Sequence, residues 1–117
     1  MQRFCDELIA GEKNGTKLDV LHGYLDADIV VIDEIGKEFH GPWTAAARFD
    51  GINALYENGK TIVATCNMSP EELIAFYDLP RPGIDSTSGA SLVGRIVERC
   101  GGSSALVEVT AESERWK

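Results

Sequence analysis

The sequence lacks the features that identify several common classes of protein. Its three cysteines form no Cys-x-x-Cys arrangement, so neither a zinc site nor a disulfide framework is indicated. The histidines, His22 and His40, are too isolated to suggest a metal site. No signal peptide and no apolar run of about 18 residues is present. We therefore expect a reduced, cytoplasmic protein with no membrane partner.

Positive charge is also scarce. The chain of 117 residues has 11 Lys and Arg against 19 Asp and Glu, which gives a formal net charge of −8. A free-standing DNA-binding domain is normally basic, so we do not expect this segment to carry a main DNA contact. The remaining composition, 44% hydrophobic and 26% charged, is that of an ordinary globular protein.

A third absence concerns phosphate binding. The phosphate-binding motif G-x-x-x-x-G-K-[ST] does not occur in the sequence. The closest run, Gly59-Lys60-Thr61, leads into a predicted strand, whereas the motif leads out of a strand into a helix. Ala54 stands where the motif requires its first glycine. The chain therefore carries no P-loop.

What the sequence does contain is a short apolar run, 28–36, in which two adjacent carboxylates follow Ile32. The run predicts a buried strand of a parallel sheet. A charged pair at the tip of a buried strand is costly unless a cation meets it, and a magnesium–nucleotide complex does so. Asp33 would hold the metal and Glu34 would polarise the attacking water, which is the Walker B pattern. The alternative is that both acids only cap the next turn.

A second predicted strand, 61–66, ends in Asn67, 34 residues after Asp33. In ATPases of the AAA+ class, the strand after Walker B ends in a polar sensor residue. Asparagine suits this role because its amide can donate to phosphate and accept from water. Alone, an asparagine after a strand is more often a turn residue.

The segment 91–100 predicts a helix with one apolar stripe and two arginines off that stripe. Arg99 lies nearer the apolar edge, and Arg95 points further toward solvent. A guanidinium beside a subunit interface can reach a neighbour's γ-phosphate as an arginine finger. The alternative is a solvated helix face on which both arginines and Glu98 are ordinary surface charges. The stripe consists of Leu92, Val93, Ile96, Val97 and Cys100.

Taken in order, these motifs resemble a known family. The order is Ile-Asp-Glu-Ile-Gly, a strand ending in Thr-Cys-Asn-Met, then Gly-Arg-Ile-Val-Glu-Arg-Cys, and finally a last strand with Ser-Glu-Arg-Trp. Over nearly its whole length, the chain resembles the DnaC/DnaI-type helicase loaders and the related IstB-type transposition ATPases, which are AAA+ ATPases.

The resemblance implies a role for single residues. Asp33 matches the Walker B metal residue and Glu34 the catalytic glutamate. Asn67 matches sensor 1. Arg99, which follows an acidic residue as in the family, matches the arginine finger, and Arg95 is the second candidate.

The resemblance also implies a fold and a function. Residues 1–117 would form a partial AAA+ domain of the α/β class, with a mostly parallel sheet and flanking helices but neither the P-loop strand nor the lid. The intact protein would bind ATP and Mg²⁺, form a homo-oligomer, and couple ATP hydrolysis to loading a replicative ring helicase on DNA. One alternative is an IstB-like helper of a transposase. Another is an ATPase-dead adaptor that binds a helicase or a sister subunit, which the missing P-loop favours for the isolated chain.

Two departures from the family affect the expected fold. Without the P-loop strand, the apolar strands have unpaired edges, which invite aggregation or strand exchange. We expect either a fragment of a longer protein or a sheet closed in another way, by direct pairing of the two strands or by pairing with another copy. The second departure is a turn-rich insertion at 79–89, between the sensor and the arginine helix.

The remaining expectations are local. Helices are expected at 3–12, 17–25 and 44–56, and another begins at 69–72 with a capping box. The last strand is expected at 105–110. Residues expected to face inward are Phe49, Ile52, Leu55 and Tyr56 of the third helix, together with Cys5, Cys66 and Cys100.

Overall fold

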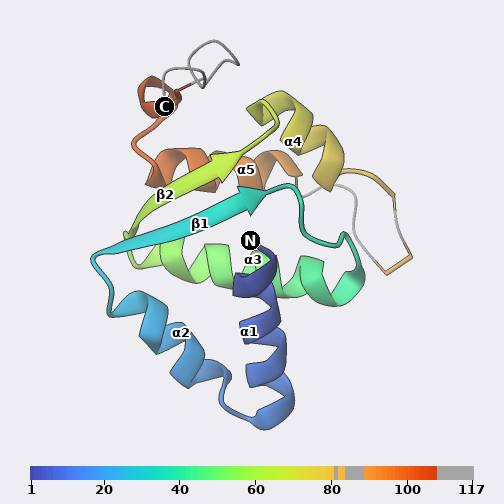
Figure 1. Cartoon of the computed structure of the whole chain (residues 1–117), viewed down its shortest axis with the longest axis vertical. Coiled ribbons are helices and arrows are strands. Elements are labelled where there is room, and N and C mark those ends of the chain that lie inside the picture. Colours follow the sequence, from blue (N-terminus) through green and yellow to red (C-terminus); the bar gives the residue numbers. More distant parts are fainter. Residues whose placement is uncertain (81, 84–88, 108–117) are drawn as a thin grey trace, which may run out of the picture.

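The computed structural model describes residues 1–80, 82, 83 and 89–107 (Figure 1). In this part of the chain, a two-stranded sheet is accompanied by five α-helices and one short 3₁₀ turn. None of these helices is long and apolar enough to cross a membrane. The elements are α1 (Gln2–Asn14), α2 (Lys17–Leu25), β1 (Ile29–Ile35), α3 (Pro42–Glu57), β2 (Thr61–Cys66), α4 (Pro70–Tyr77), α5 (Gly89–Arg99) and the 3₁₀ turn Ser103–Ala105.

The two strands pair directly and in parallel, joined by the crossover helix α3. Ile29 lies opposite Thr61, and the register is regular until Ile32. It is then interrupted, and Ile35 pairs with Cys66. Direct pairing of the two predicted strands, one of the closures expected from the sequence, is therefore confirmed. The interruption falls on Asp33 and Glu34.

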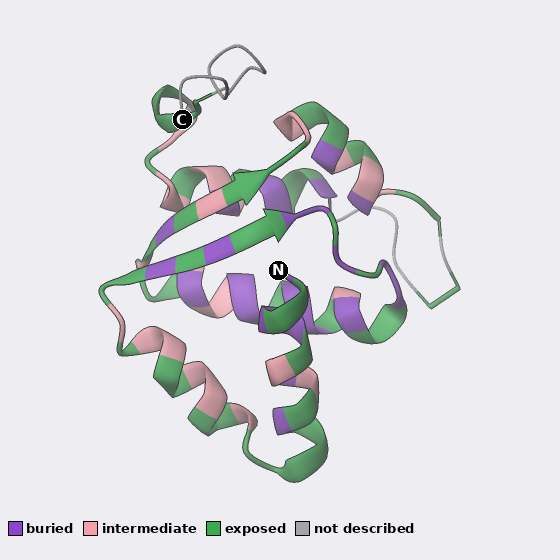
Figure 2. Cartoon of the chain, viewed as in Figure 1, coloured by how far each residue is buried: buried purple, intermediate pink, exposed green. Residues whose placement is uncertain are grey.

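The core lies on one face of this sheet (Figure 2). The alternate β1 residues Val30 and Ile32 point into it, and so does Ile62 of β2. Met1, Ile35 of β1 and residues of helices α1, α3, α4 and α5 contribute the rest of the cluster. Its largest fully buried side chains are Tyr77, Leu8, Ile35, Ile52, Leu55, Ile62 and Cys5.

The opposite face of the sheet is open, which corrects the expectation of a strand buried on both sides. Ile29 and Val31 are 56% and 61% exposed, and Val63 beside them is 48% exposed. Parallel sheets are usually covered by helices on both faces. Here the elements within the described ranges cover only one, so the β-branched residues of the other face meet solvent.

Helix α3 begins at Pro42, two residues earlier than predicted, because proline suits the first turn of a helix, where its missing N–H is not needed. Ile52 and Leu55 face inward as expected, and Tyr56 is half-buried. The prediction for Phe49 is wrong: its side chain is 41% exposed, and its neighbour Arg48 is buried instead. A polar partner for Arg48, described below, makes this burial possible.

Helix α4 confirms the predicted capping box. Glu72 donates its backbone N–H to the Ser69 hydroxyl, and Ser69 donates its N–H to the Glu72 carboxylate. This reciprocal pair satisfies two backbone donors that a helix start leaves open.

The strand predicted at 105–110 is not observed at the described positions 105–107. Ala105, expected to begin the last strand, ends the 3₁₀ turn, and neither Leu106 nor Val107 belongs to a strand. Positions 108–110 of that prediction lie outside the described residues, as do 81 and 84–88 of the insertion.

All three cysteines carry free thiols. Cys5 is buried as expected, and burial raises the pKa of its thiol to about 12. Cys100 is half-buried, but Cys66 is exposed, contrary to expectation. Cys66 ends β2 and, like Asp33 and Glu34 at the end of β1, is exposed to solvent.

Candidate functional site

The two adjacent acids lie at the carboxyl end of β1, where the strand pairing is irregular. Glu34 has a φ of 57°, a left-handed conformation that is uncommon for any residue other than glycine. Both Asp33 and Glu34 are exposed, which corrects the expectation of costly buried carboxylates. Lys37 lies 3.6 Å from the Glu34 carboxylate, but this exposed ion pair is weak. The acids are therefore open to a ligand arriving from solvent.

Thr65 of β2 connects the two acids, and sequence reasoning missed it. Its hydroxyl accepts the backbone N–H of Glu34 at 2.8 Å and donates to the Asp33 carboxylate at 3.3 Å. The pairing of Ile32 with Ala64 places Thr65 beside Asp33. A parallel register drawn through the two predicted strands could therefore have identified this threonine.

Asn67 directly follows β2 and is exposed. Since β1 and β2 are parallel, their carboxyl ends share one edge of the sheet. The structure therefore brings Asp33, Glu34 and Asn67 to this edge. Two residues later, Ser69 caps α4, which fixes the chain just beyond Asn67.

The two arginines of α5 lie elsewhere. Arg99 packs against the turn at Gly59, which precedes the amino end of β2. Its Nε is buried and has no hydrogen-bond partner among the described residues. Arg95 is half-buried, with its guanidinium 5.7 Å from the ring centre of Phe49 and 5.6 Å from that of Tyr56. Arg95 thus packs on α3. This corrects the expectation that Arg95 points toward solvent.

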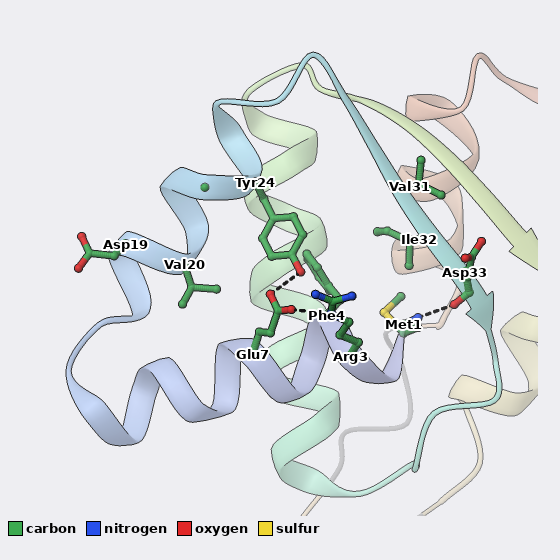
Figure 3. Close-up of a pocket in the computed structure, with 11 residues that line it drawn as sticks. Met1, Arg3, Phe4, Glu7, Asp19, Val20, Tyr24, Val31, Ile32 and Asp33 are labelled. Carbon is green, nitrogen blue, oxygen red and sulfur yellow. Dashed lines mark hydrogen bonds and ion pairs between the residues drawn. The ribbon is translucent and has the colours of Figure 1, made fainter.

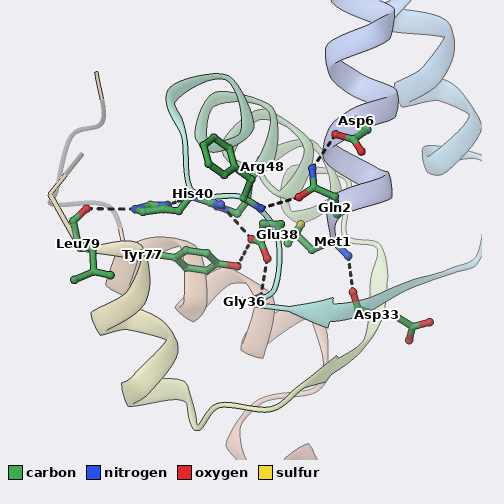
Figure 4. Close-up of polar contacts among 11 residues, drawn as sticks. Met1, Gln2, Asp6, Asp33, Gly36, Glu38, His40, Arg48, Tyr77 and Leu79 are labelled. Atoms are coloured by element: carbon green, nitrogen blue, oxygen red, sulfur yellow. Dashed lines mark hydrogen bonds and ion pairs between the residues drawn. The ribbon is translucent and has the colours of Figure 1, made fainter. Parts of the chain in front are cut away.

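A buried polar network lies next to the carboxyl end of β1, the end that carries Asp33 and Glu34 and is called the acidic edge below (Figure 4). Its centre is Glu38, whose side chain is 0% exposed. One carboxylate oxygen accepts the backbone N–H of Gly36 at 2.7 Å. The other accepts the Tyr77 hydroxyl at 2.6 Å and an Arg48 N–H at 3.1 Å. The network joins the loop after β1 to both α3 and α4.

Aromatic and imidazole groups extend this network. The Arg48 guanidinium lies 4.1 Å from the ring centre of Tyr77, and another of its nitrogens is 3.3 Å from His40 Nδ1. His40 Nε2 is 3.3 Å from the carbonyl oxygen of Leu79, a geometry that suits a neutral ring donating from Nε2. Burial and the nearby Glu38 carboxylate raise the pKa of the Tyr77 hydroxyl.

Sequence reasoning missed this network because its members are far apart in the chain. Glu38 and Tyr77 are 39 residues apart, and His40 appeared isolated. The available signal was Arg48 itself. It falls between Ala47 and Phe49 on a helix where the period places it on the apolar side, near Ile52 and Leu55.

A separate pocket of about 610 Å³ lies between α1, α2 and the side of β1 that is not paired with β2 (Figure 3). Inside it the Tyr24 hydroxyl donates to Glu7 at 2.7 Å, and burial with this bond raises the pKa of Tyr24 to about 12. Asp33 reaches the pocket through its main chain, since its backbone carbonyl accepts from the Met1 amino group while its carboxylate points away. The pocket is therefore not part of the acidic edge.

Comparisons with known proteins give one informative similarity. No protein-family model matches the chain. The chain is 31% identical over 77 residues to the chromosomal replication initiator protein DnaA of Borrelia turicatae (strain 91E135). The match covers 66% of this chain but 16% of that protein. The similarity is to a replication initiator, so the finer resemblance to DnaC/DnaI-type or IstB-type proteins stays a prediction.

Proposed function

We propose that residues 1–117 supply the Walker B and sensor 1 part of an AAA+ ATPase domain, and that the intact protein loads a ring helicase in DNA replication. The observation that carries this proposal is the placement of Asp33, Glu34 and Asn67 at one edge of two directly paired parallel strands. The similarity to a protein named as a chromosomal replication initiator supports a role in replication over one in transposition.

The residues at this edge supply some of the oxygen ligands that a magnesium ion needs, but not all of them. Mg²⁺ prefers oxygen ligands, keeps several waters, and is usually held by one or two carboxylates together with substrate phosphates. Asp33 and Glu34 offer such oxygens to solvent. In the described part of the chain, no group of three or more His, Cys, Asp or Glu side chains could hold a metal ion. Phosphate oxygens and water therefore have to complete the coordination shell.

Each side chain then has a distinct task. A magnesium ion supplies charge neutralisation on the phosphates, and Asp33 is the residue that would hold it. Glu34 would accept a proton from the attacking water, and the Asn67 amide would donate to phosphate or orient that water. Thr65 bonds to the backbone N–H of Glu34 and to one oxygen of the Asp33 carboxylate, so it holds the Glu34 main chain and the Asp33 side chain relative to each other.

This chain alone lacks the groups needed to bind ATP, because the backbone amides and the lysine of a P-loop provide most of the binding affinity for the phosphates. We expect calorimetry on residues 1–117 to show no appreciable ATP binding. Micromolar affinity would contradict this reasoning and indicate a nucleotide site of another kind.

The decisive test of the acids uses a longer protein that carries a P-loop strand and helix ahead of residue 1. Glu34→Gln should keep ATP binding and lose most turnover, whereas Asp33→Asn should also weaken magnesium-dependent binding. Near-wild-type hydrolysis in both variants would reduce the pair to a structural turn. An absence of ATP hydrolysis in the unmutated longer protein would instead favour the ATPase-dead adaptor, which the missing P-loop already makes a candidate for the isolated chain.

We also propose that Arg99 acts on the ATP site of a neighbouring copy. Arg99 lies near the amino end of β2, whereas the acids lie at the carboxyl end of β1, so one chain does not bring them together. In the same longer protein, inactive Arg99→Ala should be partly rescued by mixing with Glu34→Gln, since a finger given in trans contributes roughly 10³–10⁵ in rate. A dead mixture of co-assembled subunits would exclude Arg99 and make Arg95 the residue to test.

A further inference from the structure

The backbone of Glu34 adopts a conformation that a glutamate does not choose by itself. Its φ of 57° lies in the left-handed region, where the side chain crowds the backbone. Such a residue persists only where its surroundings fix it. On one side the Thr65 hydroxyl accepts the Glu34 N–H, and on the other Lys37 donates its N–H to the Glu34 carbonyl at 3.2 Å.

A second anchor acts two residues further on, at Gly36. Its N–H donates to the Glu38 carboxylate at 2.7 Å, and both groups are buried. A hydrogen bond to an ionised acceptor is stronger than a neutral one, and burial removes the competition from water. The turn that carries Glu34 is therefore tied to a buried carboxylate.

This carboxylate cannot move, because its other oxygen is held from two helices. Arg48 donates to it from α3 and Tyr77 donates to it from α4. The Arg48 guanidinium also lies over the Tyr77 ring, which locks the two donors against each other. Gly36 packs closely on α4 as well: a Cβ added there would lie 3.1 Å from Leu73.

We infer that Glu38, held by Arg48 and Tyr77, is a positioning residue for the Glu34 carboxylate, an assignment that rests on the proposed function. It fixes the turn after β1 relative to α3 and α4. Since α4 begins just after Asn67, the same network fixes Glu34 and Asn67 relative to one another. A role in stability alone does not account for this arrangement, because buried ion pairs are often no more stabilising than apolar residues of similar volume.

The test uses the 117-residue chain and its amide signals in NMR spectra. Two variants weaken the network: Glu38→Gln removes the charge and turns one acceptor into a donor, and Tyr77→Phe removes a donor without any change of charge. The matched control is Glu7→Gln, because Glu7 also accepts a tyrosine hydroxyl and pairs with an arginine, but on α1. In both network variants, the Gly36 amide should exchange with solvent roughly tenfold faster or more, and the Glu34 signal should shift. The control should leave both signals in place.

A second readout concerns the carboxylates themselves. Mn²⁺, a paramagnetic substitute for Mg²⁺, should broaden the signals of Asp33 and Glu34 in the wild-type chain, and Asp33→Asn should remove this effect. Glu38→Gln and Tyr77→Phe should weaken the Mn²⁺ affinity of this edge several-fold while α1 and α2 keep their signals. A purely structural role would not change the affinity of a folded variant.

The outcomes separate the two proposals. Folded network variants with unchanged Gly36 exchange or unchanged Mn²⁺ affinity overturn the positioning role of Glu38. So does a wild-type Gly36 amide that exchanges as fast as exposed turn amides, a measurement that needs no variant. If Mn²⁺ leaves Asp33 and Glu34 unaffected in the wild type, the proposed metal role fails instead, and the exchange data still show whether the turn is anchored.

Discussion

Replacing Arg48 by methionine is the most direct perturbation of the buried network. Methionine keeps much of the length and the apolar stem of arginine but removes the charge. The Glu38 carboxylate then stays 0% exposed with the Gly36 N–H and the Tyr77 hydroxyl as its named donors but no cation. Removing one partner of a buried ion pair costs about 3–5 kcal/mol, because an uncompensated charge is left behind.

This loss is large against the total stability of a domain, which is about 5–15 kcal/mol. With a urea m-value of about 1–3 kcal/mol per molar, the unfolding midpoint should fall by roughly 2 M. Urea titration followed by far-ultraviolet circular dichroism measures this shift, since helices make up most of the described structure. The m-value should stay the same if the folded and unfolded states keep their exposed areas.

Two controls make the measurement specific. Arg3→Met is the same substitution in the exposed Arg3–Glu7 pair, where Arg3 is 92% exposed, and it should cost no more than about 0.5 kcal/mol. The double variant Glu38→Gln/Arg48→Met should recover about 1 kcal/mol or more, because the buried charge is gone. A loss below about 1 kcal/mol for Arg48→Met at an unchanged m-value would refute the view that the network holds a costly buried carboxylate.

Three further changes test other parts of the structure. Glu34→Gly should raise the free energy of unfolding by up to about 1 kcal/mol, because glycine adopts the observed φ without strain; a loss of stability would show that the Glu34 side chain itself stabilises the turn. Ser69→Ala should cost about 1 kcal/mol and Ser69→Gly only a few tenths in thermal unfolding, since the capping hydroxyl is lost in both but glycine tolerates the cap backbone; equal losses would argue against the cap. Burial raises the pKa of Cys5 from 9.0 to about 12, so its contribution to stability is complete below pH 9 and is lost as the pH rises toward 12. Cys5→Ala should therefore make the fall of the unfolding free energy with pH less steep in this window by up to about 1.4 kcal/mol per pH unit, and an identical slope would contradict the raised pKa.

Elements with a local signal were predictable from the sequence. Positions 17–25 and 61–66 match α2 and β2 at both ends, because turn residues bound them and their apolar periods are clear. The capping box at Ser69 was also predictable, since its two side chains act within one helical turn. The acidic pair and Asn67 could be placed at one sheet edge because parallel strands share their carboxyl ends.

Features that depend on what covers a surface were not predictable. Val31 and Val63 are β-branched apolar residues of the kind that buried strands contain, yet no described element covers their face of the sheet. Phe49 was expected inside because it is apolar, but Arg48 occupies the inward position since Glu38 can pair with it there. The helical period places Arg48 on the inward side, but the partner that makes its burial possible, Glu38, lies 10 residues away and outside the helix, where the period gives no information.

The two strongest departures from local sequence rules lie close together and share one physical link. Glu34 has a backbone conformation suited to glycine, and Glu38 has a side chain whose burial is otherwise rare for a glutamate. Between them lies Gly36, bonded through its N–H to the Glu38 carboxylate. Natural sequences break local rules mainly at functional or strained sites, where other contacts compensate. If the conformation of Glu34 were incidental, nothing would link it to a buried carboxylate held by two further helices. Their connection through one turn argues that the contacts of Arg48 on α3 and Tyr77 on α4 with Glu38 serve to hold Glu34 in place.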